Sequence, residues 1–232
     1  MAGDLNRPDS LSTALDGVRG VFLLPGYSDM PGLLAAIAQA GVKRVVLLSG
    51  GSAASGDERN AVSAYMIRSE AAVQDSGLPW TILRPSGFMS NTLQWVAQLQ
   101  AGNLVRAAFA NVRVAMIDPA DIAAVAAKGL LGSGDADELH RITGPESLLP
   151  ADRVRILAEV LGRELHFEAQ TDADARVEMA ATMPVDYVDA FFDFYVGGAL
   201  DESPVLPTVH EILARPPRTF EQWATAHAAA FG

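Results

Sequence analysis

The chain has 232 residues, no cysteine and a formal net charge of −11 at pH 7. The lack of cysteine excludes disulfides, thiolate catalysis and cysteine metal sites. The acidic balance makes nucleic acid and anionic membrane surfaces unfavourable partners. Half of the residues are hydrophobic and 19% are charged, which is typical of a globular chain. No apolar run is long enough for a membrane span, and the N-terminus lacks a signal-peptide pattern, so we expect a cytoplasmic protein. The four histidines lack metal-binding spacing, so we expect no metal site.

The first 85 residues alternate between apolar runs and helical patterns. Continuous apolar runs predict strands buried on both faces, whereas apolar residues repeating every three to four positions predict helices. The pattern predicts a short helix at 10–15, strands at 20–24, 43–48 and 79–83, and helices at 30–40 and 58–76. Such alternation predicts a parallel sheet, and ligands bind such sheets at the carboxyl ends of the strands.

The rest of the chain is richer in helix. Asp118 followed by Pro119 is a strong helix start, because aspartate caps and proline suits the first turn. The elements predicted are helices at 91–101, 118–131 and 150–161, with β-like segments at 104–109, 112–117, 140–143 and 165–169. From residue 172 onward the pattern is helical, through 184–196 and again at 219–231. We therefore expect two regions packed as one unit: a partial dinucleotide-binding domain at 1–145 and an α-rich substrate region at 146–232.

Several of these segments carry a family resemblance. They are the apolar run that ends at Leu24, the stretch 40–49, the stretch 76–85 that ends in Arg84-Pro85, the helix start 118–123, and Thr143-Gly144-Pro145. In order and spacing the chain resembles an atypical short-chain dehydrogenase/reductase of the NmrA-like, NAD(P)H-binding group. The resemblance implies an α/β Rossmann-like parallel sheet and a smaller, mostly helical C-terminal substrate region. Members of the group include reductases and also redox-sensing regulators that bind the cofactor without turnover.

One part of the family pattern is not found. No G-x-x-G-x-x-G or G-x-G-x-x-G loop precedes the run at 20–24, although such a loop holds the dinucleotide pyrophosphate. We therefore expect a Rossmann-like sheet that misses its first strands and a start codon placed late in a longer gene product. The alternative is a genuinely shortened protein, in which the run at 20–24 would become an unpaired apolar edge.

The resemblance implies two catalytic candidates, Tyr65 and Ser52. In short-chain dehydrogenases a tyrosine on this helix donates a proton with the help of a lysine four residues later, but here that position is Ser69. Without the lysine, nothing evident lowers the phenol pKa from about 10. Tyr65 is then a contact to the cofactor ribose or a weak acid, and the alternative is a tyrosine that packs under a loop.

The resemblance also implies binding residues. The cofactor-binding candidates are Asp4, Leu5, Leu24, Pro25, Ser49, Tyr65, Pro85, Gly87 and Phe88, and the substrate candidates are Phe88, Asn91, Trp95 and Phe191. The aromatic stripe at 187–195 has an alternative role as hydrophobic core. Among the carboxylates, Asp118 and Asp121 are expected to cap a helix, and Glu70 is expected to be solvated or at an interface. Arg84 is expected to pair with one of them.

The sequence thus predicts an NAD(P)H-dependent reductase that transfers hydride to a small apolar carbonyl, a quinone or a similar acceptor. NADP is preferred slightly over NAD by family habit, and the chain as it stands can also lack bound cofactor. Two alternatives stay open, a regulatory or binding module and a cofactor-independent isomerase or cyclase that uses the same cleft. The partner expected is a small apolar or aromatic substrate, and a homo-oligomer is compatible with the sequence.

Overall fold

The structure is a computed structural model that describes residues 3–132 and 137–232. Contacts divide the chain into two compact units, each built from two stretches of sequence. The first comprises Met1–Pro85 and Ala123–Arg141, and the second comprises Ser86–Ile122 and Ile142–Gly232. These units are defined by packing, whereas the boundary at 145 was placed by family function and stays a prediction.

The first unit contains a sheet of four strands in the order β1-β2-β3-β5. They are β1 (Gly20–Leu23), β2 (Arg44–Leu48), β3 (Trp80–Pro85) and β5 (Glu138–Ile142). Strand β2 runs parallel to both β1 and β3, with Val45 opposite Val21 on one side and Trp80 on the other. The predicted α/β fold with a parallel sheet is therefore confirmed.

Burial of the strands follows their place in the sheet. Val45, Val46 and Leu47 of the inner strand β2 have no exposed surface. Phe22 of β1 is 42% exposed, so the expectation that β1 is buried on both faces is wrong at this residue. Among the described strands β1 lies at an edge of the sheet, so Phe22 has a strand neighbour on one side.

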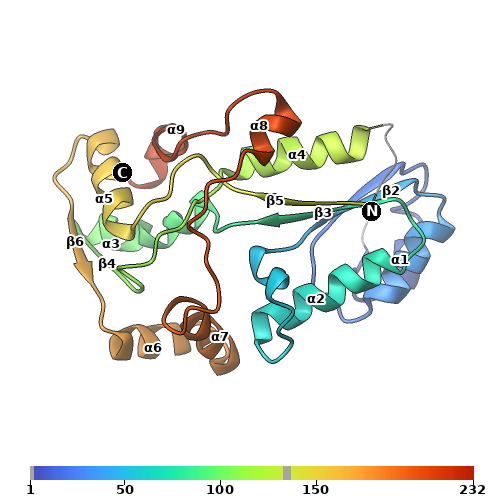
Figure 1. Ribbon diagram of the computed structural model, residues 1–232, viewed down its shortest axis with the longest axis horizontal. Helices are drawn as coiled ribbons and strands as arrows, with labels where there is room; N and C mark the ends of the chain where they lie inside the picture. Colours follow the sequence, from blue (N-terminus) through green and yellow to red (C-terminus); the bar gives the residue numbers. More distant parts are fainter. Residues whose placement is uncertain (1–2, 133–136) are drawn as a thin grey trace. The chain divides into compact units, whose positions relative to one another are not determined.

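Helices cover this sheet on its two faces (Figure 1). Helices α1 (Met30–Gln39) and α2 (Ala61–Gln74) lie on one face, and α4 (Pro119–Leu131) lies on the other. Gly129 lets α4 approach closely, because a Cβ there would lie 3.1 Å from Val46 Cγ2. The core between α1, α2 and the sheet includes Leu23, Leu33, Leu34, Ile37, Val45, Leu47, Val73 and Ile82.

The loops of the first unit hold short 3-10 helices. The helix predicted at 10–15 is a 3-10 turn, η1 (Pro8–Leu11), and a second one, η2 (Gly51–Ser55), follows β2. Helix α2 starts later than predicted because Asn60 caps it, its side chain accepting hydrogen bonds from the backbone N–H groups of Val62 and Ser63.

The second unit is mostly helical around a small parallel sheet. Strand β4 (Leu104–Ala107) pairs with β6 (His166–Ala169). Its other elements are η3 (Met89–Trp95), α3 (Val96–Ala101), α5 (Pro150–Leu161), α6 (Asp172–Ala180), α7 (Val185–Tyr195), α8 (Thr208–Leu213), α9 (Phe220–Ala226) and η4 (Ala228–Ala230).

The predictions for this unit are confirmed in part. Helix α5 has the predicted bounds, whereas α8 was not predicted. The segment predicted as β-like at 112–117 makes isolated bridges, Phe88 with Ile117 and Val114 with Leu148.

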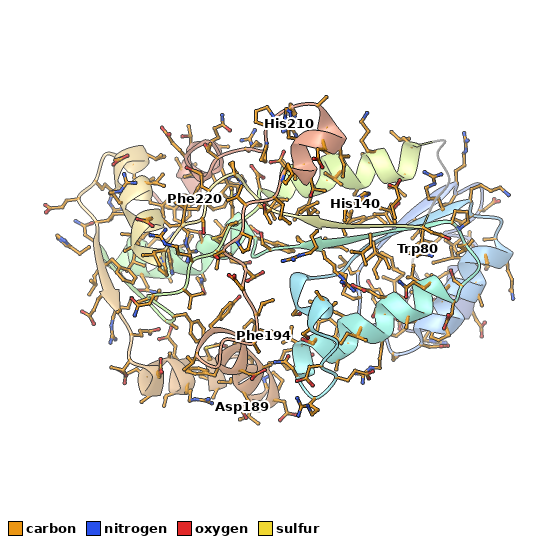
Figure 2. The ribbon with its side chains drawn as sticks, in the orientation of Figure 1. Trp80, His140, Asp189, Phe194, His210 and Phe220 are labelled. Atoms are coloured by element: carbon orange, nitrogen blue, oxygen red, sulfur yellow. The ribbon has the colours of Figure 1, made fainter. Side chains whose placement is uncertain are left out.

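Aromatic residues fill the core of the second unit. Phe220, labelled at the start of α9 in Figure 2, stacks on Trp223 with ring centroids 5.6 Å apart. Both rings pack with Trp95, Leu157 and Phe231. Within the two described ranges, the helices are all too short or too polar to cross a membrane.

Candidate functional site

The loop after β1 forms a fixed turn at the carboxyl edge of the first unit's sheet. Gly26 has a φ of 90°, and its backbone N–H donates to Ser69 Oγ at 2.9 Å. Ser69 in turn donates to the carbonyl of Tyr65 on α2. The Tyr65 ring lies against the same turn, since a Cβ on Gly26 would be 3.2 Å from Tyr65 Cδ2. Thus Ser69, at the position where lysine was looked for, ties this loop to the helix.

A buried polar cluster lies between α2 and the sheet and consists of Ser49, Glu70 of α2 and Arg84 of β3. Glu70 is 4% exposed and accepts from Ser49 Oγ at 2.5 Å and from Arg84 Nε at 2.9 Å. Its second oxygen lies 2.5 Å from Arg84 Nη2. The expected pairing of Arg84 with a carboxylate is confirmed. The expectation that Glu70 is solvated or at an interface is wrong, because the two-pronged contact to Arg84 holds it inside the unit.

Three further candidates of the first unit are Ser52, Asp4 and Leu5. Ser52 is buried in η2, with its hydroxyl 3.5 Å from the sulfur of Met66. Asp4 accepts a hydrogen bond from the backbone N–H of Asn6, and Leu5 is exposed. Asn6 reaches the loop after β1, where its side-chain oxygen accepts from Ser28 N at 2.9 Å. The catalytic and cofactor roles of these residues stay predictions.

Two of the predicted cofactor-binding residues, Leu24 and Pro25, lie at the end of β1. Leu24 follows the strand directly and is 47% exposed, while Pro25 is half-buried. Gly26 has no side chain, and the Tyr65 ring fills the place that a Cβ would take, with Cδ2 at 3.2 Å from it. The exposed Leu24 side chain thus offers apolar contact area beside the Tyr65 turn, and its cofactor role stays a prediction.

The second unit contains a cavity of about 460 Å³, within the size range of small-molecule sites. Four aromatic residues stand out on its wall: Trp95, Phe109, Phe191 and Tyr195. Phe109 packs on Tyr195 with ring centroids 5.0 Å apart and has a φ of 55°, unusual for a bulky residue. The wall also includes Gly87, Asn91, Gln94, Gln98, Arg106, Val114, Met116, Arg153, Gln170, Glu178, Met179 and Met183.

The structure brings most of the predicted substrate residues to this cavity. Asn91, Trp95 and Phe191 lie on its wall, as does Gly87 from the cofactor set. Phe88 is half-buried and makes a backbone bridge to Ile117. The aromatic stripe of α7 serves both alternatives: Phe194, labelled in Figure 2, is 3% exposed in the core, whereas Phe191 faces the cavity. Binding of a substrate by these residues stays a prediction.

Sequence reasoning missed Arg153. The residue is 9% exposed, and its guanidinium carbon lies 4.8 Å from the centroid of the Trp95 ring. Its Nε makes no hydrogen bond, and the described residues provide no ion pair for it. Burial lowers the pKa of Arg153 to about 10, so the side chain is charged at neutral pH. A signal existed, since Arg153 interrupts the apolar stripe formed by Pro150, Val154 and Leu157.

Tyr195 and Glu202 form a second polar feature of the cavity region. The Tyr195 hydroxyl donates to Glu202 Oε2 at 2.8 Å. Burial, with the nearby Glu202 carboxylate, holds the pKa of Tyr195 well above its ordinary value. This phenol is therefore a hydrogen-bond donor and a poor proton donor.

Two acidic residues at the start of α4 are structural. Asp118 accepts from the backbone N–H of Ala120, which confirms the predicted cap, and its other oxygen lies 2.6 Å from Arg218 Nε. The expectation that Asp121 also caps the helix is wrong, because its fully buried carboxylate accepts from Arg218 N at 2.7 Å. Arg215 Nη2 lies 2.7 Å from the other Asp121 oxygen, without hydrogen-bond geometry. These contacts attach segment 215–218 to the helix start.

Comparison with known proteins identifies the family of the chain. A family model described as NAD(P)H-binding matches residues 1–131, which is more than half of the chain. A (4-alkanoyl-5-oxo-2,5-dihydrofuran-3-yl)methyl phosphate reductase of Streptomyces griseus is 38% identical over 228 residues, covering 96% of this chain and 80% of the relative. An NAD(P)H azoreductase of Xenophilus azovorans is 35% identical over 238 residues, covering 100% of this chain and 83% of the relative.

The fold is similar to that of a solved reductase. An NADPH-dependent quinone oxidoreductase of Escherichia coli has a TM-score of 0.77 at 19% identity, with 97% of this chain and 81% of that one covered. A structure of that enzyme with NADPH gives a TM-score of 0.76 at 20% identity over the same shares. The chain therefore belongs to the NAD(P)H-binding oxidoreductases of the NmrA-like, atypical short-chain dehydrogenase/reductase family.

Proposed function

We propose that the chain is an NAD(P)H-dependent reductase of small aromatic or conjugated acceptors. The observation that carries the proposal is the cavity of the second unit, walled by Trp95, Phe109, Phe191 and Tyr195, in a member of an NAD(P)H-binding family. Its relatives are named for reduction of an unsaturated lactone phosphate and of azo compounds, and a structural neighbour for reduction of quinones. These acceptors share a conjugated system that delocalises charge.

Delocalisation of charge in the acceptor matters because the tyrosines that could protonate the product are weak acids. Ser69 stands four residues after Tyr65 and is engaged with the Gly26 turn, and the pKa of Tyr195 is raised. Addition of hydride to a quinone, an azo group or an unsaturated lactone gives an anion that the acceptor itself stabilises. Such a reaction needs little help from an acidic side chain.

Residues of the first unit would hold the cofactor, which supplies the hydride when bound. Leu24 and Pro25 would contact the nicotinamide face, and Tyr65 would contact the ribose. We propose NADPH over NADH, since neighbours of this fold were solved with NADPH and NADP(H). The cytoplasmic location and a homo-oligomeric state stay predictions.

Loss of NADPH absorbance with a naphthoquinone, an azobenzene dye and an unsaturated γ-lactone tests the reaction, with cyclohexanone as an unconjugated comparison. The assay is run on the 232-residue chain and on a version lengthened with the upstream codons of its reading frame, so that the predicted late start is tested too. Turnover with the conjugated acceptors is expected. Its absence from both versions, or equal turnover of cyclohexanone, would contradict the proposal.

Two substitutions test the roles of the first unit. Leu24→Asp is expected to weaken NADPH binding at least about tenfold, because a carboxylate replaces apolar contact area at the strand end. Leu131→Asp is the matched control, since Leu131 is 85% exposed at the end of α4. Tyr65→Phe is expected to slow turnover less than about tenfold, whereas loss of a working general acid costs about a hundredfold or more.

A further inference from the structure

The cavity of the second unit has a feature that an aromatic acceptor alone does not explain. Arg153 lies on its wall, 9% exposed, with its guanidinium carbon over the Trp95 ring at 4.8 Å from the centroid. A buried cation is costly unless an anion or several acceptors compensate it. Yet Nε makes no hydrogen bond, and no carboxylate of the described residues forms an ion pair with Arg153.

Several other polar groups on the same wall have partners. Arg106 is paired with Glu168 at 2.8 Å. The Gln98 side-chain amide donates to the carbonyl of Arg106 and accepts from its backbone N–H. The Gln170 side chain donates to the Glu178 carboxylate. The nearby Glu202 carboxylate accepts from Tyr195. Arg153 is thus the cation of the wall whose hydrogen-bonding capacity the described structure leaves unused.

We propose that Arg153 binds an anionic group, a carboxylate or a phosphate ester, carried by the aromatic or conjugated acceptor that fills this cavity. The proposal rests on the reductase function proposed above and narrows its substrate class. Guanidinium presents a planar fork of N–H donors that matches both oxyanions, and the contact with Trp95 holds the group at the cavity wall. The relative from Streptomyces griseus is named for a phosphate ester, which agrees with this chemistry.

The net charge of the whole chain opposes the binding of anions. A formal net charge of −11 repels small anions, so general electrostatic attraction cannot produce anion binding. Binding of an anion in preference to a neutral molecule of the same shape would therefore require a local cation.

Calorimetric titration of the full chain without cofactor tests this, with benzoate, phenyl phosphate and benzamide as probes in chloride buffer. Benzoate and benzamide have nearly the same shape, so they isolate the charge, and phenyl phosphate against benzoate tells the two oxyanions apart. At least one of the two anions is expected to bind about tenfold or more tighter than benzamide. Equal affinity for all three probes would overturn the proposal.

Substitutions then assign the binding to one residue. Arg153→Met is expected to reduce affinity for the preferred anion about 10- to 100-fold, the loss of charge-assisted hydrogen bonds, and to leave benzamide binding unchanged. Arg155→Met is the matched control, because Arg155 is on the same helix, exposed, and paired with Glu159. Anion binding that survives Arg153→Met but is lost in Arg106→Met would overturn the assignment.

Thermal melting separates binding from a structural role. Because Arg153 lacks a charged partner in the described structure, Arg153→Met is expected to melt at or above the temperature of the parent. Lower melting with unchanged anion affinity would show a merely structural arginine. If Arg153→Met does not fold, Arg153→Lys replaces it, and this variant must still prefer the anion over benzamide. No cofactor or turnover enters these assays, so failure of the reductase function would be distinguished from failure of this inference.

Discussion

Glu70 accepts hydrogen bonds from both Nε and Nη2 of Arg84, although the two residues lie on a helix and on a strand of the first unit. The Ser49 hydroxyl adds a third bond to the same carboxylate. Both side chains are largely buried, so water cannot replace either partner of the ion pair without a large cost in free energy.

Replacing Glu70 with Gln is therefore expected to destabilise the protein by about 3 kcal/mol, because Arg84 would keep its charge without a counterion. Urea denaturation followed by circular dichroism measures this change. Glu159→Gln is the control, since Glu159 forms an exposed pair with Arg155 and should change stability by less than about 1 kcal/mol. Similar effects of the two substitutions would show that the Glu70 pair is not special.

Asp121→Asn tests the attachment of segment 215–218 to the start of α4. Asp121 is fully buried, accepts from Arg218 N and faces Arg215. Loss of its charge is expected to cost about 2 kcal/mol and to increase hydrogen exchange in segment 215–218. Unchanged exchange in that segment would mean that other contacts hold it.

Gly144→Ala tests a close backbone approach within the second unit. A Cβ at this position would collide with the carbonyl oxygen of Met116, which belongs to the backbone and cannot rotate away. The expected loss of stability is about 3 kcal/mol, at the upper end for overpacking. Gly102→Ala provides the comparison, because a Cβ on Gly102 meets no heavy atom within 4 Å. Equal melting temperatures of the two variants would contradict the predicted clash.

The Tyr195 phenol is expected to stay protonated through the alkaline range in which tyrosines normally ionise. Burial and the Glu202 carboxylate both disfavour the phenolate, so the pKa moves upward and ionisation is delayed. Ultraviolet titration should then give the same phenolate absorbance up to about pH 11 for the parent and for Tyr195→Phe. A smaller rise in the variant would mean that Tyr195 ionises normally.

Hydrophobic patterning predicted the elements that depend on local sequence. The strands at β1, β2 and β3 and the bounds of α5 follow from continuous apolar runs and from helix periodicity. The segment 112–117 was predicted as β-like, but it forms isolated bridges instead of a strand. These bridges join it to distant parts of the chain, and hydrophobic periodicity does not encode such contacts. Helix α8 is six residues long, too short for a pattern to emerge.

The candidate site was less predictable because its charges are decided by tertiary contacts. Glu70 looks like a surface residue in a helix, and only the position of Arg84 on β3 makes it a buried partner. Arg153 is the reverse case, an arginine in an apolar stripe for which the fold supplies no counterion in the described residues. The family resemblance found Trp95 and Phe191 but carried no information about either charge.

The division of the chain into interleaved stretches limits how this protein can be dissected. The cavity-bearing unit consists of Ser86–Ile122 and Ile142–Gly232, and the intervening residues belong largely to the other unit. A single cut before Ser86 would therefore keep the whole cavity-bearing unit on one fragment, together with residues 123–141 of the first unit, and would divide the first unit between the two fragments. Isolating the cavity-bearing unit would require a short designed linker to join residues 122 and 142, whose loop-closure entropy depends only weakly on linker length.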